Sequence, residues 1–374
     1  MRRGNFIILC LEAAVMAFSV VATTALVPSI AGEFALSQFL TGKVIWIYML
    51  TYGFAALIYG PLTRTFHARR ILLTCSLLFS LACLLTAGAR TMNTLFAGRF
   101  LMGLFGASVI PLSLIYIAHH TESTNRGKSV GLFFSLAFVS SLLGLILSGV
   151  IYWRFIYLIP GIAGILFWPL AYFYLPNLKI DLGAFRVRYL EALKDRRIIS
   201  IFTYIFIVSL IYHGTQQWLG VYFSTEYALS QFLISILITL TVLSGIFGEA
   251  IGGFYADKIG RVKTVSLGLL FMILSITLLA LKLPFLILAV VMLLWGLGWT
   301  FNHSGTSTML TDLPEEYVNE AASLNSSVRF IAGGAGAGLG GILMQKGFAF
   351  GFTVFLVCLF LLLLFSKRLL VNRN

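Results

Sequence analysis

The chain has 374 residues, of which 59 % are hydrophobic and 10 % are charged, and its mean hydropathy is +0.98. A soluble domain is nearer half apolar and a quarter charged, so this composition excludes a soluble globular protein. The formal net charge of +13 raises the question of a nucleic-acid partner, which the placement of the charges answers below.

Apolar runs of about 20 residues are long enough to cross a bilayer as helices. We expect twelve such spans, at residues 6–31, 44–63, 70–89, 94–118, 129–152, 155–175, 198–223, 230–255, 264–282, 284–308, 319–344 and 348–366. The alternating polarity of a membrane β-barrel is absent. The first run is far longer than the core of a signal peptide, about 7–15 residues, so we interpret it as a retained helix. The predicted fold class is an all-α integral membrane protein.

The basic residues are distributed unequally between alternate loops. Of the 26 Lys and Arg residues, 19 fall on the side of the N-terminus, 5 on the other side and 2 within spans. This asymmetry follows the positive-inside rule and predicts that both termini are cytoplasmic. It explains the net charge without nucleic acid, and leaves the lipid bilayer, with some attraction to anionic lipid, as the partner. We expect a multi-pass protein of the bacterial plasma (inner) membrane.

The longest polar interruption, at about residues 175–198, separates the first six spans from the last six. We therefore predict an N-terminal six-helix bundle at 1–175, a cytoplasmic central loop at 176–197 and a C-terminal six-helix bundle at 198–374.

The two halves repeat at an offset of about 193 residues. At this offset "GPLTRTFHARR" (60–70) aligns with "GFYADKIGRVK" (253–263), and Gly103 aligns with Gly296. The stretch "GLILSG" (144–149) falls within one residue of "GAGLGG" (336–341). Repeated six-helix halves are typical of transporters, with the substrate site between the halves near the midplane.

The charged loop between the eighth and ninth spans carries a recognisable pattern. It reads G-x-x-x-D-(R/K)-x-G-R-x-(R/K) at Gly253, Asp257, Lys258, Gly260, Arg261 and Lys263. The earlier copy keeps Gly60, Arg69 and Arg70, but has Arg64 in place of Asp and His67 in place of the second Gly. Together with R-x-x-x-G-x-x-G at Arg99, Gly103 and Gly106, these motifs make the whole chain resemble a major facilitator superfamily transporter.

The resemblance implies twelve helices around a central cavity and a gate at the cytoplasmic ends. Asp257 would face the start of the fifth helix near Arg126 and hold the outward-facing state, or the loop acts only as a topology determinant. Glu249, one turn before the loop, is assigned to the same gate. The gate candidates are Gly253, Asp257, Lys258, Gly260, Arg261, Lys263, Glu249, Arg126, Gly60, Arg69 and Arg70.

Apart from Tyr, Cys and residues at the span ends, six ionisable side chains fall inside the predicted spans, where burying charge is costly and indicates a functional site. Spans 3, 6, 9 and 12 contain none of them, and the resemblance implies that these four helices face lipid. The candidates for substrate or proton binding are Glu12, Arg99, His213, Gln216, Gln217, Asn302, His303 and Arg329.

Each candidate has a functional and a structural interpretation. Glu12 would couple protons, because desolvation favours a neutral carboxyl group, or contact a cationic substrate, or reach the interface. Arg99 would relay protons, attract an anion or act as a hydrogen-bond hub. Arg329 would bind an anionic group or form a fixed ion pair. His213 and His303 would line the cavity or fill a packing position.

The cysteines Cys10, Cys75, Cys83 and Cys358 all lie in apolar runs and are interpreted as packing residues. The sequence contains no metal-binding spacing, nucleophile elbow or Walker loop. We therefore expect no enzyme activity, no metal and no cofactor, and a monomer.

The leading hypothesis is a secondary transporter of a small molecule that works by rocker-switch alternating access and couples efflux to protons. Leu145 replaces the Pro of the family's antiporter signature, which weakens the antiport assignment. An uptake symporter or a facilitator is the alternative. A different class is a membrane sensor or assembly protein that kept the fold without transport. The sequence leaves the substrate open.

Overall fold

The computed structural model describes residues 3–63, 65–177, 189, 193–281, 283–313 and 315–370. The part described divides into two compact units, Met1–Arg186 (unit 1) and Val187–Asn374 (unit 2). Three expectations lie outside the described residues: Arg64, the side chain of Arg126, and most of the central loop, namely 178–188 and 190–192.

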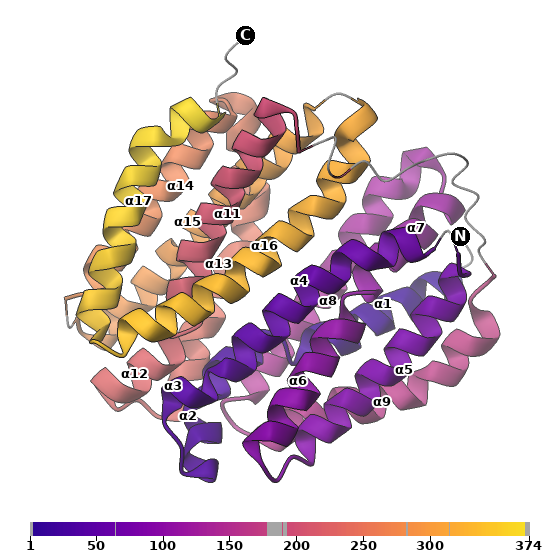
Figure 1. The fold of residues 1–374 in the computed structure, drawn as a ribbon, viewed down its shortest axis with the longest axis horizontal. Coiled ribbons are helices and arrows are strands. Elements are labelled where there is room, and N and C mark those ends of the chain that lie inside the picture. Colours follow the sequence, from indigo (N-terminus) through magenta and orange to yellow (C-terminus); the bar gives the residue numbers. More distant parts are fainter. Residues whose placement is uncertain are drawn as a thin grey trace. The chain divides into compact units, whose positions relative to one another are not determined.

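Both units are built from long helices (Figure 1). Unit 1 contains α1 (Arg3–Phe18), α2 (Ala22–Phe34), α3 (Gln38–Thr41), α4 (Lys43–Leu62), α5 (Ala68–Ala87), α6 (Met92–Gly106), α7 (Val109–His120), α8 (Ser123–Leu147) and α9 (Trp153–Tyr174). Unit 2 contains α11 (Arg196–Gln216), α12 (Leu219–Tyr227), α13 (Gln231–Lys258), α14 (Arg261–Leu279), α15 (Phe285–Thr311), α16 (Glu315–Met344) and α17 (Phe348–Leu370). Within the described ranges they form twelve spans long and apolar enough to cross a membrane, which confirms the predicted fold class.

Three spans are interrupted where the sequence predicted continuous helices. The first consists of α1 and α2, the fourth of α6 and α7, and the seventh of α11 and α12. At the first break the Thr23 hydroxyl donates to the carbonyl of Ser19 at 2.8 Å and lies 2.8 Å from the Tyr157 hydroxyl. Irregular backbone at membrane depth is tolerated only where protein or a cavity satisfies its polar groups, so the breaks mark the polar interior of each unit.

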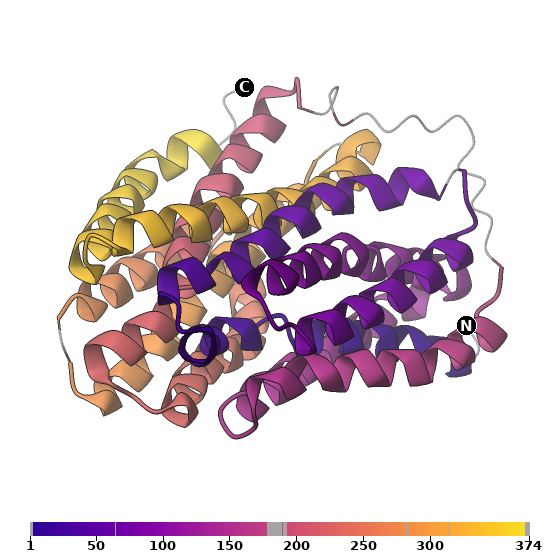
Figure 2. The same cartoon turned by 60° about the horizontal axis from the view of Figure 1, so that its bottom comes forward.

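The same packing pattern occurs in both units (Figure 2). In unit 1, α1 packs on α8 and α9, α4 packs on α6, and α5 packs on α6 and α9. In unit 2, α11 packs on α16 and α17, α13 packs on α15, and α14 packs on α15 and α17. Each pair occupies the same place in its own set of six spans, which confirms the predicted six-helix repeats.

Matching glycines make matching contacts at the predicted offset. A Cβ atom on Gly103 of α6 would collide with the carbonyl oxygen of Tyr48 in α4. A Cβ atom on Gly296 of α15 would collide with the carbonyl oxygen of Thr241 in α13, and both positions are 193 residues further along the chain. Small residues allow this close approach of helices in a membrane.

At one end of unit 1 an ion pair joins three spans. Arg154, at the start of α9, lies 2.6 Å from the Glu33 carboxylate at the end of α2. Its Nη1 donates to the carbonyls of Ala87 and Ala89 at the end of α5, at 2.6 and 2.7 Å. The sequence places Arg154 in a loop and does not reveal this junction.

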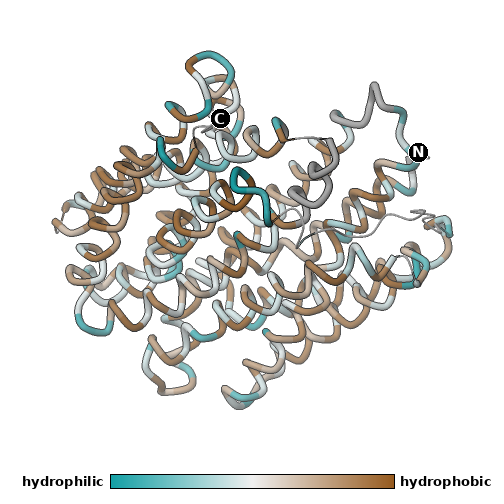
Figure 3. The backbone as a smooth tube through the Cα atoms, turned by 45° about the horizontal axis from the view of Figure 1, so that its top comes forward, coloured by the Kyte–Doolittle hydropathy of each residue, from teal (hydrophilic) through white to brown (hydrophobic). Residues whose placement is uncertain are grey.

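The helices are apolar along their length and the connecting turns are hydrophilic (Figure 3). Several large apolar side chains point away from the protein, including Leu286 at 79 % exposure, Phe173 at 76 % and Leu364 at 74 %. Water would penalise such faces, whereas lipid chains are as apolar as these side chains. The exposed apolar surface is therefore the surface that contacts the bilayer.

Candidate functional site

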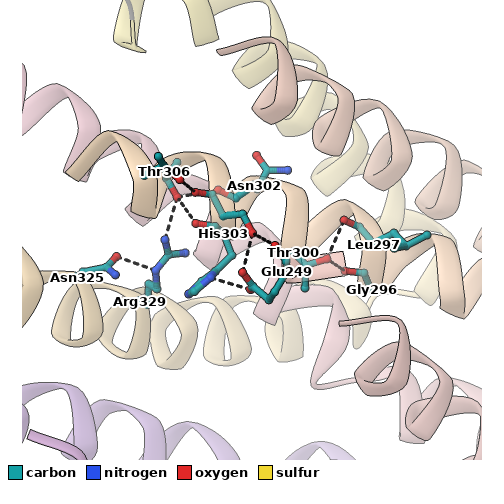
Figure 4. A network of polar contacts seen from close by, with 11 residues as sticks. Glu249, Gly296, Leu297, Thr300, Asn302, His303, Thr306, Asn325 and Arg329 are labelled. Carbon is teal, nitrogen blue, oxygen red and sulfur yellow. Dashed lines mark hydrogen bonds and ion pairs between the residues drawn. The ribbon is translucent and has the colours of Figure 1, made fainter. Parts of the chain in front are cut away.

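A cluster of polar side chains connects three helices of unit 2 (Figure 4). His303 of α15 lies with Nδ1 2.8 Å from the Glu249 carboxylate of α13. The Ser304 hydroxyl donates to the other oxygen of the same carboxylate at 2.6 Å. The sequence predicts Glu249 in the gate and His303 in the substrate site, and the structure brings the two side chains together.

Arg329 of α16 lies beside this cluster and is 7 % exposed. Its Nε donates to the amide oxygen of Asn325 at 2.8 Å, and its Nη2 donates to the Thr306 hydroxyl at 2.9 Å. Thr306 in turn donates to the backbone carbonyl of Asn302 at 2.7 Å. The remaining nitrogen, Nη1, is buried and has no hydrogen-bond partner among the described residues.

Aromatic rings of α11 and α15 form a stack next to Arg329. The ring of Tyr212 stacks on Trp295 with centroids 5.3 Å apart and on Trp299 with centroids 4.2 Å apart. Trp295 is fully buried, whereas Trp299 is half-buried and makes an edge contact with His213 at 5.4 Å. The stack therefore runs from the core of unit 2 to a partly accessible surface.

The amide candidates divide between this surface and the core. Gln217 is half-buried and its Nε2 lies 3.2 Å from Nδ1 of His213, so it belongs to the surface. Gln216 is buried and accepts a hydrogen bond from the Trp295 indole at 2.9 Å. The Asn302 side chain points away from Arg329 (Figure 4) and donates to the carbonyl of Gly298 at 2.8 Å. Gln216 and Asn302 are thus core residues in this structure.

Arg99 of α6 is enclosed in unit 1 and is 1 % exposed. Its Nε donates to the carbonyl of Val44 at 3.0 Å. Its guanidinium carbon lies 4.3 Å from the ring centroid of Tyr48 and 5.8 Å from that of Tyr157. Among the described residues no carboxylate lies within ion-pair distance, so aromatic faces and a carbonyl hold this charge.

Glu12 of α1 is also enclosed in unit 1 and is 4 % exposed. Its carboxyl group lies near the hydroxyl of Ser76 in α5, which itself donates to the carbonyl of Leu73 at 3.3 Å. No Lys, Arg or His nitrogen of the described chain forms an ion pair with it. Glu12 therefore does not reach the membrane–water interface. The nearby Ser76 lies on α5, a helix that the resemblance assigns to the lipid side.

The second copy of the charged loop lies at the start of α14. Gly260 has φ +93°, a conformation that glycine adopts more easily than other residues. It directs Arg261 toward Asp312, which follows α15, and the two side chains form a two-point ion pair at 2.7 and 2.9 Å. Arg261, Asp312 and Lys263 also line a pocket of about 380 Å³.

The other members of this loop are at the surface. Asp257 and Lys263 are exposed, and Lys258 lies over the ring of Phe254 at 5.5 Å. A Cβ atom on Gly253 would meet no described heavy atom within 4 Å, so this glycine is not required by close packing. The expected pairing of Asp257 with Arg126 involves a side chain outside the described residues.

The first copy of the loop makes different contacts. Arg69 of α5 donates to the carbonyl of Tyr172 at the end of α9 and to the amide oxygen of Asn177, the latter at 3.3 Å. Arg70 is exposed. His67 stands where the second copy has its left-handed glycine, and it has φ −62°. A Cβ atom on Gly60 would meet no described heavy atom within 4 Å.

Five residues of these contacts were missed from the sequence: Trp299, Ser304, Thr306, Asp312 and Asn325. Asn325 was accessible to sequence reasoning, because it lies four residues before Arg329 on one helix face. Thr306 and Ser304 were not, because their partners come from other helices. The described residues contain no group of three or more His, Cys, Asp or Glu side chains placed to hold a metal.

Comparison with known proteins agrees with this arrangement. A family model described as Major Facilitator Superfamily matches residues 8–337 and also 222–373. The MFS-type transporter YwfA of Bacillus subtilis (strain 168) is 25 % identical over 351 residues, covering 89 % of this chain and 83 % of that protein. The puromycin resistance protein pur8 of Streptomyces alboniger is 32 % identical over 149 residues, covering 40 % of this chain and 29 % of that protein.

A solved structure of a D-xylose-proton symporter superposes with a TM-score of 0.79 at 14 % identity, covering 98 % of this chain and 97 % of that one. At this identity the likeness shows the fold alone. The family match, by contrast, spans nearly the whole chain and includes both six-helix units. The chain belongs to the major facilitator superfamily of membrane transporters.

Proposed function

We propose that this transporter moves a small organic molecule outward across the bacterial plasma membrane in exchange for protons. In this proposal both termini lie in the cytoplasm. The 19 basic residues on the side of the termini favour this orientation. The two six-helix units alternate access to the substrate. An ion gradient supplies the energy.

The buried Glu12 carboxyl group carries the proposal of proton coupling. It is 4 % exposed, the Ser76 hydroxyl lies near it, and no described cation forms an ion pair with it. A carboxylate without a cationic partner is costly at membrane depth, so the enclosed group is stable when it carries a proton. Opening to water would then release that proton, which is the cycle that coupling requires.

Export is favoured over import by the partial similarity to a puromycin resistance protein. Leu145 in the fifth span departs from the antiporter signature, and this substitution is the main argument against exchange. In this structure α8 is continuous through Leu145.

The charged loop at α14 serves as a gate in this proposal. Arg261 and Asp312 join the ends of α14 and α15, and an exposed pair of this kind contributes about 0–1 kcal/mol. A contact of that size breaks readily during a cycle between two states that differ by a few kcal/mol. Asp257, exposed in this structure, is free to pair with Arg126 when the gate closes.

Proton symport is a second candidate, and one observation favours it. Arg329 has a buried nitrogen without a partner, so unit 2 has a positive charge available to a bound anion. Carrying an anion at Arg329 together with a proton at Glu12 moves no net charge across the membrane, which favours symport.

The decisive experiment measures proton movement in proteoliposomes with an internal pH dye. A panel of amphipathic cations, organic anions and sugars is added to wild type and to Glu12→Gln, in which an amide imitates the protonated acid. We expect compound-dependent proton flux in wild type and its loss in the variant. The sign of the flux distinguishes exchange from symport.

Glu33→Gln is the matched control, because it neutralises an acid of the same helical span that is bound by Arg154. We expect this control to retain its flux. Equal flux in wild type and Glu12→Gln, with both proteins folded, would contradict the assignment of Glu12 as the proton carrier.

A further inference from the structure

We infer that the surface formed by Arg329, Trp299, His213 and Gln217, here called the Arg329 surface, binds a planar organic acid by its carboxylate. This inference names the substrate class of the proposed transporter and rests on its being a transporter. It holds for export and for import, because it concerns binding alone.

The first argument is the incomplete hydrogen bonding of Arg329. A guanidinium has five N–H donors, and here Nε and Nη2 are used by Asn325 and Thr306. Nη1 is buried and has no partner among the described residues. An unsatisfied buried donor costs about 1–3 kcal/mol, and more when it is charged. Nη1 is enclosed in this structure, so a ligand reaches it only when neighbouring side chains move, and a carboxylate that accepts from it then removes this cost.

The second argument is the local charge. Glu249 of α13 is the acid that faces Arg329, but it does not form an ion pair with Arg329. Its carboxylate is instead bound by His303 of α15 and by a serine hydroxyl. From α11, His213 and Tyr204 lie near Arg329, and neither carries a negative charge at neutral pH. The guanidinium thus keeps one positive charge without a direct counter-ion.

The third argument is the aromatic wall beside the free nitrogen. The planes of Tyr212 and Trp299 differ by 11°, and the Arg329 guanidinium lies 5.6 Å from the Trp299 ring centroid. Trp299 and His213 are half-buried, so an edge of this wall is accessible. Offset stacking of a flat apolar group on such a wall contributes about 0.5–1.5 kcal/mol beyond the area that it buries.

The unpartnered guanidinium nitrogen and the aromatic wall together fit one kind of molecule, a planar organic acid. A carboxylate monoanion suits a guanidinium that has no direct ion-pair partner, and it accepts hydrogen bonds from one guanidinium nitrogen. A planar apolar group attached to it would lie against Trp299. Gln217, whose amide lies near His213, would provide a further polar contact at the edge.

The test uses equilibrium dialysis of purified full-length protein with radiolabelled 2-naphthoate and its neutral isostere 2-naphthamide. We expect wild type to bind the acid at least tenfold more tightly than the amide. Arg329→Gln should remove this preference, and Arg329→Lys should retain part of it. Lys346→Gln removes one exposed positive charge just after α16 and should bind as wild type does. A thermal melt of each variant reports folding.

Equal binding of the acid and the amide by wild type overturns the inference, as does the absence of binding by both. Preference for the acid that survives in Arg329→Gln overturns it as well. A failure of proton coupling leaves this result unaffected, because dialysis involves no gradient. Conversely, proton flux that occurs only with cations would support proton-coupled transport and exclude an organic acid as the substrate.

Discussion

Each unit contains one arginine buried among membrane helices, and the two are held in different ways. Arg99 in unit 1 is 1 % exposed and lies between the rings of Tyr48 and Tyr157, with its Nε bound to a carbonyl. Arg329 in unit 2 is 7 % exposed and keeps one buried nitrogen without a described partner.

The difference shows that burial alone does not identify a binding site. Arg99 is surrounded by groups that satisfy it, so a ligand would have to displace them. Arg329 lies near two histidines and a half-buried Trp299, and a ligand there would complete the hydrogen bonding of its Nη1. The sequence marked both arginines equally, and only their neighbours separate them.

The largest expected effect is on stability, and it distinguishes the two arginines. Arg99→Ala removes a cation–π contact of about 2 kcal/mol and leaves a cavity between two tyrosines. We expect a loss of about 3 kcal/mol in the free energy of unfolding, which corresponds to roughly 6–12 °C in the melting temperature of a unit of this size. Arg329→Ala should cost about 1 kcal/mol, because it also removes an unsatisfied donor. Thermal melts in detergent measure both.

A third variant sharpens this result. Arg99→Met fills most of the same volume without charge, and such replacements of buried charges are often nearly neutral. Melting close to wild type in Arg99→Met would assign Arg99 to packing. If Arg329→Ala melted as low as Arg99→Ala, the distinction between the two arginines would be lost.

The two copies of the charged loop also differ, both in backbone conformation and in the partner of their arginine. In the second, Gly260 adopts φ +93° and Arg261 reaches Asp312. In the first, His67 adopts an ordinary extended conformation and Arg69 binds the end of α9 instead. Loss of the glycine therefore accompanies a different backbone and a different partner.

A smaller effect is expected when this glycine is replaced. Gly260→Ala forces a side chain into a backbone conformation, φ +93° and ψ 149°, that is essentially restricted to glycine, and should cost about 1–3 kcal/mol of stability. Gly253→Ala lies within α13 and meets no close described neighbour, so it should be neutral or slightly stabilising. Thermal melts of the two variants test this difference in stability. Equal melting temperatures would show that the positive φ of Gly260 does not affect stability.

The fold could be predicted from the sequence because many residues of each long segment contribute to the same signal. Twenty apolar residues specify a span, and the offset of 193 residues was confirmed by the contacts of Gly103 and Gly296. The interruptions at the first, fourth and seventh spans were missed. Turns of this kind are apolar in sequence and are fixed by contacts with other helices, as Thr23 and Tyr157 show.

The candidate site was predicted less completely. Polar residues within apolar runs identified Arg329, His303 and Glu249. The sequence did not show which of these side chains are in contact. Glu249 and His303 are 54 positions apart in the chain, and their 2.8 Å contact depends on how α13 packs on α15. Gln216 and Asn302 look like cavity residues in sequence, yet tertiary packing places both in the core.

The central claim is that Glu12 carries the proton while the solute binds elsewhere. Solute counterflow in proteoliposomes without a gradient tests it most directly, with the solute identified by the proton-flux panel and with wild type and Glu12→Gln compared. The amide imitates the protonated acid, so we predict that the variant exchanges solute near the wild-type rate yet fails to move it against its gradient when a proton gradient is imposed. Loss of both activities would place Glu12 in substrate binding or folding, and retention of both would exclude it from coupling.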